Sequence, residues 1–252
     1  HAGATLVNCS SHKGCMNTAC SGAFETFRIT DGKIFAFGNH MERLWRACKI
    51  LNVPMPSEAK IKNKLKSITK ITGDYRAKII ANAAGKVEII AKSLPKLKFE
   101  KVSCCFTSAI PSQYPFKSTD RREYERCEKI AKSKGFDLPL LTDAKIGYVL
   151  ESSIANVFIV KDGVVSTPPI KGIVNGVARK TVLSLCKKLG IKAKIKKMAR
   201  NDVRSSDEIF LTNALRFVFG VSRIGRKKYG CSISKLLFSK YALVAEHTSE
   251  RL

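Results

Sequence analysis

One stretch of the chain, residues 147–158, constrains the fold more than any other. It leads from a glycine through an acidic residue, Glu151, and a small polar cluster to Asn156 and a β-rich run. The run ends in Lys-Asp-Gly at residues 161–163, a strong signal for a tight turn between antiparallel strands. A second short β-rich segment, residues 164–167, follows at once, so the pattern predicts a β-hairpin.

The first half of the chain alternates segments of strand and helix character. Apolar residues at helical spacing predict helices over residues 40–51 and 57–72, and Pro54 and Pro56 end the first of them. The β-rich segments between and around these helices predict strands over residues 23–29, 33–37, 75–83, 86–91 and 96–106.

The second half of the chain continues this alternation on either side of the hairpin. Asp120 and Glu123 form a capping-box pattern that predicts a helix, which Gly135 ends. A later helix is expected to begin at Asn175-Gly176 and to end at Gly190, and a strand is expected over residues 208–212. Helices and strands in this mixed order predict an α/β (α+β) fold.

A segment with two prolines, residues 108–115, is the best candidate for a linker between domains. Its prolines and small polar residues cannot continue a helix or a central strand. We therefore expect a small N-terminal α/β domain over residues 1–108, an interdomain linker over residues 109–116 and a larger C-terminal domain over residues 117–252.

Length and composition exclude several classes of protein. A chain of 252 residues with 44% hydrophobic content can bury a substantial core. No uninterrupted apolar run approaches the ~20 residues that a membrane-spanning helix needs. The polar sequence at residues 9–13 interrupts any apolar region of a signal peptide. We therefore expect a cytoplasmic protein without a membrane partner.

The nine cysteines follow no disulfide spacing, and their number is odd. In a chain of this length they are interpreted as mostly buried or free thiols in a reducing cytosol. Four potential metal ligands, Cys9, His12, Cys15 and Cys20, lie within twelve residues. Their spacing is not that of a standard zinc finger or knuckle, so no metal site is assigned.

The formal net charge of +26 predicts an anionic partner. Nucleic acid, an anionic membrane and a small polyanionic substrate would all satisfy such a charge. The basic residues are spread along the whole chain and are not interleaved with aromatic residues, which argues against a stacking platform for single strands. The densest basic segment, residues 192–200, partly alternates polar and apolar residues and predicts a half-buried strand.

Three kinds of residue that pyridoxal phosphate chemistry requires occur along the chain. Lys117, just before a helix, is a candidate for covalent attachment of the cofactor, and Glu151 is a candidate partner for its pyridine nitrogen. A phosphate group is best bound by an arginine and by free N–H groups at a helix N-terminus. Arg43 on the first predicted helix and the helix start at residues 175–179 could supply both.

Five motifs in register resemble the class IV (fold-type IV) aminotransferases, a family of enzymes that depend on pyridoxal 5′-phosphate. The resemblance covers about residues 5 to 222, and it implies a two-domain fold with a larger C-terminal pseudo-barrel domain and a homodimer. The matching motifs are F-E-T-x-R at 24–28, H-x-x-R-L at 40–44, G-x-x-x-E-x-S-x-x-N-x-F at 147–158, T-P followed by G-V-A-R at 167–168 and 176–179, and S-D-E-I-F-L-T at 206–212.

The resemblance implies a role for each matching position. Lys117 would hold the cofactor covalently and move the proton, and Glu151 would pair with the pyridine nitrogen. Arg43 would bind the phosphate together with the backbone amides of Val177 and Ala178. The remaining cofactor-binding positions that the resemblance implies are Asn156, Gly176 and Asn213.

Two departures from the transaminase pattern resemble the aminodeoxychorismate lyases of the same family. Ala178 and Ala214 stand where transaminases usually have threonine, and residues 174–176 with 213–215 are similar to the lyase pattern. The resemblance therefore implies cleavage of 4-amino-4-deoxychorismate to 4-aminobenzoate and pyruvate. A branched-chain or D-amino acid transaminase on the same scaffold is the alternative. A basic nucleic-acid-binding protein is a more remote alternative.

Overall fold

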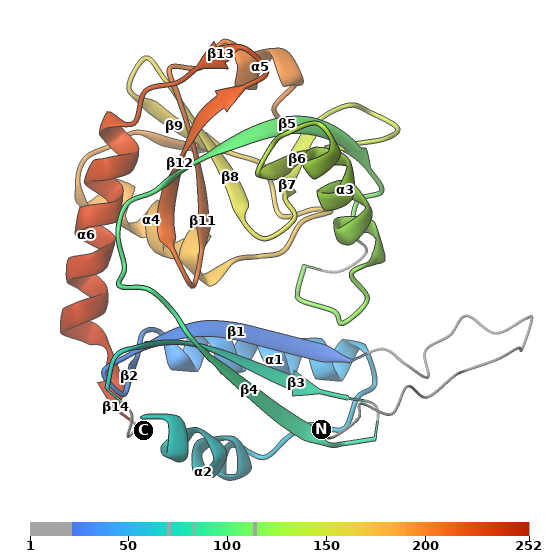
Figure 1. Cartoon of the computed structure of the whole chain (residues 1–252), viewed down its shortest axis with the longest axis vertical. Helices are drawn as coiled ribbons and strands as arrows, with labels where there is room; N and C mark the ends of the chain where they lie inside the picture. Colours follow the sequence, from blue (N-terminus) through green and yellow to red (C-terminus); the bar gives the residue numbers. More distant parts are fainter. Residues whose placement is uncertain (1–21, 70–71, 83, 113–114, 252) are drawn as a thin grey trace, which may run out of the picture.

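The computed structural model describes residues 22–69, 72–82, 84–112 and 115–251 of the chain. These residues form two β-sheets, and the smaller one lies below the larger one in Figure 1. The predicted cluster Cys9, His12, Cys15 and Cys20 lies outside these residues. Among the described residues, no group of three or more His, Cys, Asp or Glu side chains could hold a metal ion. No helix in these ranges is long and apolar enough to cross a membrane.

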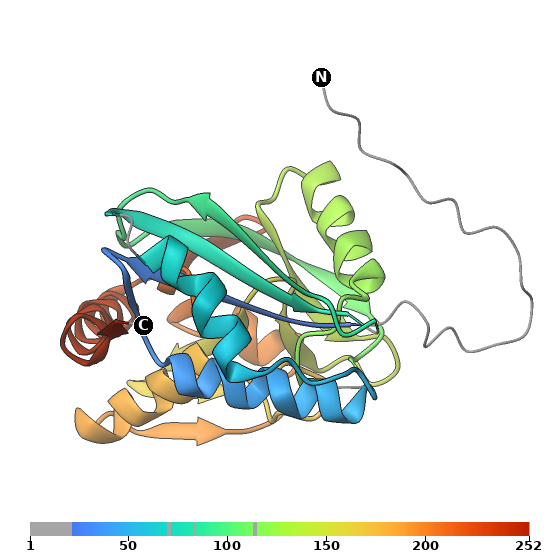
Figure 2. The same cartoon turned by 90° about the horizontal axis from the view of Figure 1, so that it is seen from below.

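The smaller sheet has five antiparallel strands in the order β14-β2-β1-β3-β4. Helices α1 (Phe37–Ile50) and α2 (Glu58–Thr69) pack against it and share one apolar core with β1 and β3. Figure 2 shows both helices on the same side of this sheet. The strands are β1 (Ala23–Thr30), β2 (Lys33–Ile34), β3 (Asp74–Ala81), β4 (Val87–Ser93) and β14 (Glu250–Arg251).

The larger sheet has nine strands of mixed direction, in the order β10-β9-β8-β11-β12-β5-β6-β7, with β13 paired to β12. Its strands are β5 (Lys101–Ala109), β6 (Leu138–Asp143), β7 (Val149–Ser152), β8 (Asn156–Lys161), β9 (Val164–Thr167), β10 (Ala193–Ile195), β11 (Glu208–Asn213), β12 (Phe217–Ile224) and β13 (Lys227–Lys228). The helices around it are α3 (Arg122–Ser133), α4 (Val177–Lys188), α5 (Arg200–Arg204) and α6 (Ser232–Thr248).

The hairpin predicted from residues 147–167 is present. Strands β8 and β9 pair antiparallel around a turn at Asp162 and Gly163, which both have positive φ values, 49° and 73°. Such values are required at the two central residues of a type I′ turn, whose twist matches that of the flanking strands. β7 immediately precedes this hairpin, so Glu151 and Asn156 come close together at its base.

The mixed α/β fold class predicted from the sequence is confirmed. The sheets, however, divide the chain earlier than the predicted linker, because β5 pairs with β12 and β6 in the larger sheet. The chain passes from one sheet to the other within residues 94–100, and β14 near the C-terminal end returns to the smaller sheet. Alternation along β5 predicts a strand but does not indicate which sheet it joins. The division at residues 109–116 into two domains remains a prediction.

Two local predictions need correction. Glu123 does not complete a capping box, because its carboxylate accepts a hydrogen bond from the backbone N–H of Ile110 at 2.8 Å, and α3 begins only at Arg122. The basic segment 192–200 does form a strand, β10, but its three residues are exposed rather than half-buried. β10 lies at the edge of the larger sheet, where solvated lysines discourage pairing with another strand.

Candidate active site

The site residues predicted from the sequence meet in one small cavity between the two sheets. The cavity has a volume of about 50 Å³, and its walls come from α1, the segment before α3, β7, β8, the start of α4 and the end of β11. All eight predicted residues line it: Arg43, Lys117, Glu151, Asn156, Gly176, Val177, Ala178 and Asn213.

Lys117 is held by backbone hydrogen bonds to β1. The N–H of Phe24 donates to the carbonyl of Lys117 at 3.1 Å, and the N–H of Thr119 donates to the carbonyl of Gly22 at 2.8 Å. Burial, followed by the positive charge of Arg43, lowers the pKa of Lys117 to about 8. Its amine is therefore neutral more often near neutral pH than that of a surface lysine, as a nucleophile or base requires.

Glu151 is the acid at the floor of the cavity, and its side chain is only 3% exposed. Its carboxylate accepts hydrogen bonds from the hydroxyl of Tyr124 at 2.8 Å and from the amide of Asn156 at 3.1 Å. The backbone N–H of Val174 is a third donor, at 3.2 Å. Burial raises the pKa of Glu151 to about 7, although the hydrogen bonds from Tyr124 and Val174 oppose the rise. A cationic group bound beside it would favour the ionised form.

Asn156 fixes the distance between Glu151 and the start of α4. Its amide group donates to Glu151 and also to the carbonyl of Val174 at 2.8 Å. A Cβ atom at Gly176 would lie 2.1 Å from the Oδ1 atom of Asn156, so no larger residue fits there without displacing the amide. The backbone conformation does not require glycine, because the φ of −69° at Gly176 is available to any residue. The close approach of Asn156 is therefore the reason for glycine at this position.

Arg43 enters the cavity from α1 as part of a buried ion-pair network. Its Nε and Nη2 atoms donate to the two carboxylate oxygens of Glu25 at 2.6 and 2.8 Å, and its Nη1 atom donates to the carbonyl of Asn175 at 3.0 Å. Three of the five guanidinium N–H groups are thus engaged in these contacts, which leaves two for an anionic group in the cavity.

His40 also contacts the carboxylate of Glu25. Its Nδ1 atom lies 3.0 Å from a carboxylate oxygen of Glu25, and both side chains are buried. Burial alone would raise the pKa of Glu25, but the charge and hydrogen bonds of Arg43, helped by His40, lower it to about 2. Burial lowers the pKa of His40 itself, so the neutral ring donates from Nδ1 to the carboxylate. His40 is therefore a structural residue.

The N-terminus of α4 faces the same cavity. Gly176 is the N-cap residue and supplies no side-chain hydrogen bond, and no acidic residue lies in the first turn. The N–H groups of Val177 and Ala178 have no acceptor within the helix, as in the first turn of any α-helix. These N–H groups and the helix dipole favour an anion, and Arg43 is close to them through the carbonyl of Asn175.

Three buried hydroxyl groups on the cavity wall have no hydrogen-bond partner among the described residues. They belong to Ser152 and Ser153 at the end of β7 and to Thr212 on β11. Buried hydroxyls are normally paired, and leaving one unpaired costs about 1–3 kcal/mol. Together with Arg43 and the start of α4, they fit a group that has several hydrogen-bonding oxygen atoms, such as a phosphate ester.

Asn213 shapes the wall between this cavity and a larger neighbour. Its Oδ1 atom accepts hydrogen bonds from the N–H groups of Leu215 and Arg216 at 3.0 and 2.9 Å, which closes a tight turn after β11. Its amide donates to the carbonyl of Ile154 at 3.3 Å. The side chain is thus used within the protein, and Asn213 borders both cavities.

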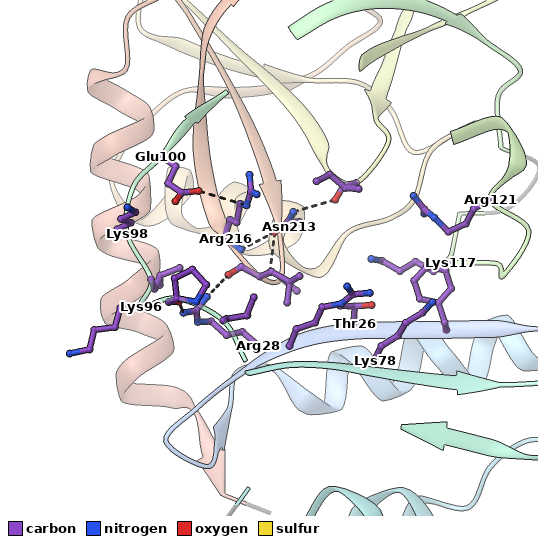
Figure 3. A pocket seen from close by; sticks show the side chains of 18 residues that line it. Thr26, Arg28, Lys78, Lys96, Lys98, Glu100, Lys117, Arg121, Asn213 and Arg216 are labelled. Carbon is purple, nitrogen blue, oxygen red and sulfur yellow. Dashed lines mark hydrogen bonds and ion pairs between the residues drawn. The ribbon is translucent and has the colours of Figure 1, made fainter. Parts of the chain in front are cut away.

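The larger neighbour is a cleft of about 460 Å³ that Lys117 also lines (Figure 3). One face of the smaller sheet forms its floor, because Phe24, Thr26 and Arg28 alternate along β1, and Arg76 and Lys78 alternate along β3. The basic side chains on its wall are Arg28, Arg76, Lys78, Lys96, Lys98, Lys117, Arg121 and Arg216, and the acidic one is Glu100.

Several residues of the site cannot be found by sequence reasoning about single positions. The sequence places Tyr124 on the apolar face of its helix, which indicates a core residue. Its contact with Glu151 joins residues 27 positions apart in the chain. Glu25 occurs in the first family motif, but nothing in the motif indicates that it pairs with Arg43, 18 residues later. The three unpaired hydroxyls lie next to or within motifs and carry no separate signal.

Comparison with known proteins agrees with this geometry. Residues 22–224 match the family model described as amino-transferase class IV. The D-alanine aminotransferase of Bacillus licheniformis is 25% identical over 238 residues, 83% of this chain and 81% of its own.

Two solved structures illustrate the shared fold. One is an aminotransferase from Brucella abortus bound to the cofactor PLP, with a TM-score of 0.83 at 21% identity, covering 97% of this chain and 95% of that one. The other is a putative 4-amino-4-deoxychorismate lyase from Legionella pneumophila, with a TM-score of 0.76 at 20% identity, covering 88% of this chain and 90% of that one. The chain belongs to the class IV aminotransferase family, and it is an enzyme whose cofactor is pyridoxal 5′-phosphate.

Proposed function

We propose that the enzyme is a 4-amino-4-deoxychorismate lyase, which forms 4-aminobenzoate and pyruvate. The observation that carries this proposal is the charge of the cleft of about 460 Å³ beside Lys117, which is lined by six basic side chains besides Lys117 and the Asp74-paired Arg28, and by one acidic side chain. Such a cleft suits a substrate that bears one carboxylate on its ring and a second on an enolpyruvyl ether better than a small amino acid with an apolar side chain. In keeping with its family, we also propose a cytoplasmic homodimer.

The small cavity would hold the cofactor. Lys117 would attach it covalently, and Glu151 would bind its pyridine nitrogen, as supported by the burial of the carboxylate and by its three hydrogen-bond donors. Arg43, the N–H groups at the start of α4 and the unpaired hydroxyls would bind the phosphate. When bound, the cofactor supplies an electron sink for charge that develops at the substrate carbon bearing the amine.

Lys117 would then act as the proton carrier. Its lowered pKa of about 8 makes the free amine a competent base for the proton at the ring carbon that bears the substrate amine. The enolpyruvyl group leaves as pyruvate with a proton delivered to its methylene carbon, and the ring becomes aromatic. The reaction is an elimination without a net oxidant or added water, so one side chain that both accepts and returns a proton is sufficient.

A transaminase is the second candidate, favoured by the names of the relatives. The Bacillus licheniformis protein is a D-alanine aminotransferase, and a relative from Rickettsia typhi, 27% identical over 248 residues, 86% of this chain and 85% of its own, is a probable branched-chain-amino-acid aminotransferase. The cleft also has apolar residues on its wall, among them Phe24, Leu94 and Leu97, which could contact an aliphatic side chain.

The two activities differ in their need for a second substrate. A lyase releases 4-aminobenzoate from aminodeoxychorismate alone, whereas a transaminase requires a keto acid to accept the amine. The holoenzyme is therefore assayed with aminodeoxychorismate in the absence of any keto acid, beside D-alanine and branched-chain amino acids with 2-oxoglutarate. Turnover of the amino acids without 4-aminobenzoate formation would refute the lyase function and support the transaminase function.

A further inference from the structure

Three basic side chains surround the ring of Phe24 at one end of the cleft. The Nζ atoms of Lys78 and Lys117 lie 4.6 and 5.4 Å from the ring centroid, and the guanidinium carbon of Arg121 lies 6.0 Å from it. Lys78 lies on β3, Lys117 lies in the segment before α3, and Arg121 is the N-cap residue of α3. Separate parts of the fold thus bring positive charge to one point beside the cofactor cavity.

The charges at this point are only loosely compensated by acids. Arg121 lies 3.8 Å from Glu128, and its guanidinium group also donates a hydrogen bond to the carbonyl of Ser153 at 2.9 Å. Lys78 makes no ion pair within 4.0 Å among the described residues, and Glu88 acts on it only at longer range. Burial, together with Arg76 and Arg121, lowers the pKa of Lys78, which indicates that a bound anion would relieve repulsion here.

Lys78 and Arg121 lie on the same side of the cleft as Lys117. In Figure 3, Lys78, Lys117 and Arg121 gather toward one side of the cleft, while Lys96, Lys98 and Arg216 lie toward the opposite side. Arg216 lies 3.9 Å from Glu100, so the far side is partly neutralised. An anionic group held by Lys78 and Arg121 would be adjacent to the reacting amine of Lys117.

From this arrangement we propose that Lys78 and Arg121 form a carboxylate-binding subsite that selects substrates carrying a second carboxylate. The inference rests on the proposed function, since it assigns part of that substrate to these two side chains. Lys78 and Arg121, which both contact the ring of Phe24, provide the charge. Charge-assisted hydrogen bonds of this kind discriminate strongly between ligands with and without the carboxylate.

Binding of unreactive ligands to the holoenzyme tests the subsite without any turnover. Isophthalate, a benzene ring with two carboxylates, is compared with benzoate, which keeps one, by calorimetric titration at fixed ionic strength. The wild-type holoenzyme is expected to bind isophthalate at least about tenfold more tightly than benzoate. Lys78→Met and Arg121→Met are each expected to reduce that preference to about threefold or less.

Matched variants separate a local subsite from a general loss of charge. Lys92→Met on β4 removes the same charge from an exposed neighbour that does not line the cleft, and it should keep the wild-type preference. Lys78→Arg and Arg121→Lys keep the charge and should retain most of the preference, and retained cofactor absorbance verifies that each variant is intact. Equal loss in Lys92→Met, or wild-type preference in both Met variants, would overturn the subsite.

The result is distinguishable from the fate of the lyase proposal. A holoenzyme that forms 4-aminobenzoate while both Met variants keep the isophthalate preference would retain the lyase and refute the subsite. A holoenzyme that forms no 4-aminobenzoate but loses the preference in both Met variants would refute the lyase and support a dicarboxylate subsite for another reaction.

Discussion

The hydroxyl of Tyr124 donates a hydrogen bond to the carboxylate of Glu151 across 2.8 Å, and this contact joins α3 to the floor of the small cavity. Tyr124 also packs beneath the guanidinium group of Arg121, whose Cζ atom lies 5.0 Å from the ring centroid. One side chain therefore helps to position both the acid assigned to the pyridine nitrogen and a basic residue of the substrate cleft.

Replacing Tyr124 by Phe is expected to weaken cofactor binding about tenfold, because Glu151 loses a donor that stabilises its ionised form. The dissociation constant of pyridoxal phosphate, measured by titration of the apoenzyme, checks this. Tyr148→Phe, at a tyrosine that lines neither cavity, serves as the control. Unchanged cofactor affinity in Tyr124→Phe would show that the hydroxyl does not position Glu151 for the cofactor.

Removal of Glu25 should destabilise the smaller sheet and its helices. Glu25→Ala leaves Arg43 without its buried partner, and breaking a buried pair in this way costs about 3–5 kcal/mol. Glu42→Ala removes an exposed i,i+4 partner of Arg46 on the same helix and should cost about 0.5 kcal/mol or less. Urea unfolding of the two variants measures the difference, and similar costs would contradict the buried network.

A methyl group at position 176 should damage the site by a purely steric route. In Gly176→Ala the new Cβ would lie 2.1 Å from the Oδ1 atom of Asn156, so the amide must move and release Glu151. Cofactor affinity is expected to fall at least about tenfold. Gly38→Ala in α1 meets no atom within 4 Å and should stabilise the protein by up to about 1 kcal/mol. Wild-type cofactor affinity in Gly176→Ala would refute the close approach.

The stability of the apoenzyme should depend on pH in two opposite ways. The pKa of Glu151 is raised from 4.5 to about 7, so its contribution is fully present below pH 4.5 and is lost as the pH rises to about 7. The pKa of Glu25 is lowered from 4.5 to about 2, so its contribution is present above pH 4.5 and is lost as the pH falls toward 2.

Glu151→Gln separates these two contributions. The free energy of unfolding of each apoenzyme is measured by urea between pH 2 and 8. In the wild type, titration of Glu151 should lower this free energy by on the order of 3 kcal/mol between pH 4.5 and 7, and Glu151→Gln should show no such decline. The decline below pH 4.5, to which Glu25 contributes together with other carboxylates of lowered pKa such as Asp74 and Asp137, should persist. A variant whose stability still falls between pH 4.5 and 7 as in the wild type would show that another group titrates there.

The motif register predicted residues that lie close together, because family motifs place Arg43, Glu151 and Gly176 at fixed points on helices, strands and turns, and their roles toward the cofactor remain predictions. All eight predicted residues line one cavity. The contacts that position them follow from packing between distant segments, such as Tyr124 against Glu151 and Glu25 against Arg43. Local pattern carries no information about such pairs, and for the same reason it did not assign β5 to the larger sheet.

The cationic cleft could not be predicted from the sequence either. A net charge of +26 indicated an anionic partner, but the basic residues are spread over the whole chain. Only the pairing of β1 with β3 shows that Thr26 faces Lys78 and that Arg28 faces Arg76 across the floor of one cleft. Ala178 and Ala214 lack the hydroxyls of the threonines that transaminases usually have there, whereas Ser152, Ser153 and Thr212 bring three unpaired hydroxyls to the cavity.

Product formation from aminodeoxychorismate tests the proposed function most directly. Purified holoenzyme is incubated with 4-amino-4-deoxychorismate and no keto acid, and 4-aminobenzoate and pyruvate are both quantified, with Lys117→Ala as the control. We predict equal amounts of the two products from the wild type and neither from Lys117→Ala. Absence of 4-aminobenzoate from a wild-type holoenzyme that transfers amino groups to a keto acid, or an equally active Lys117→Ala variant, would contradict the proposal.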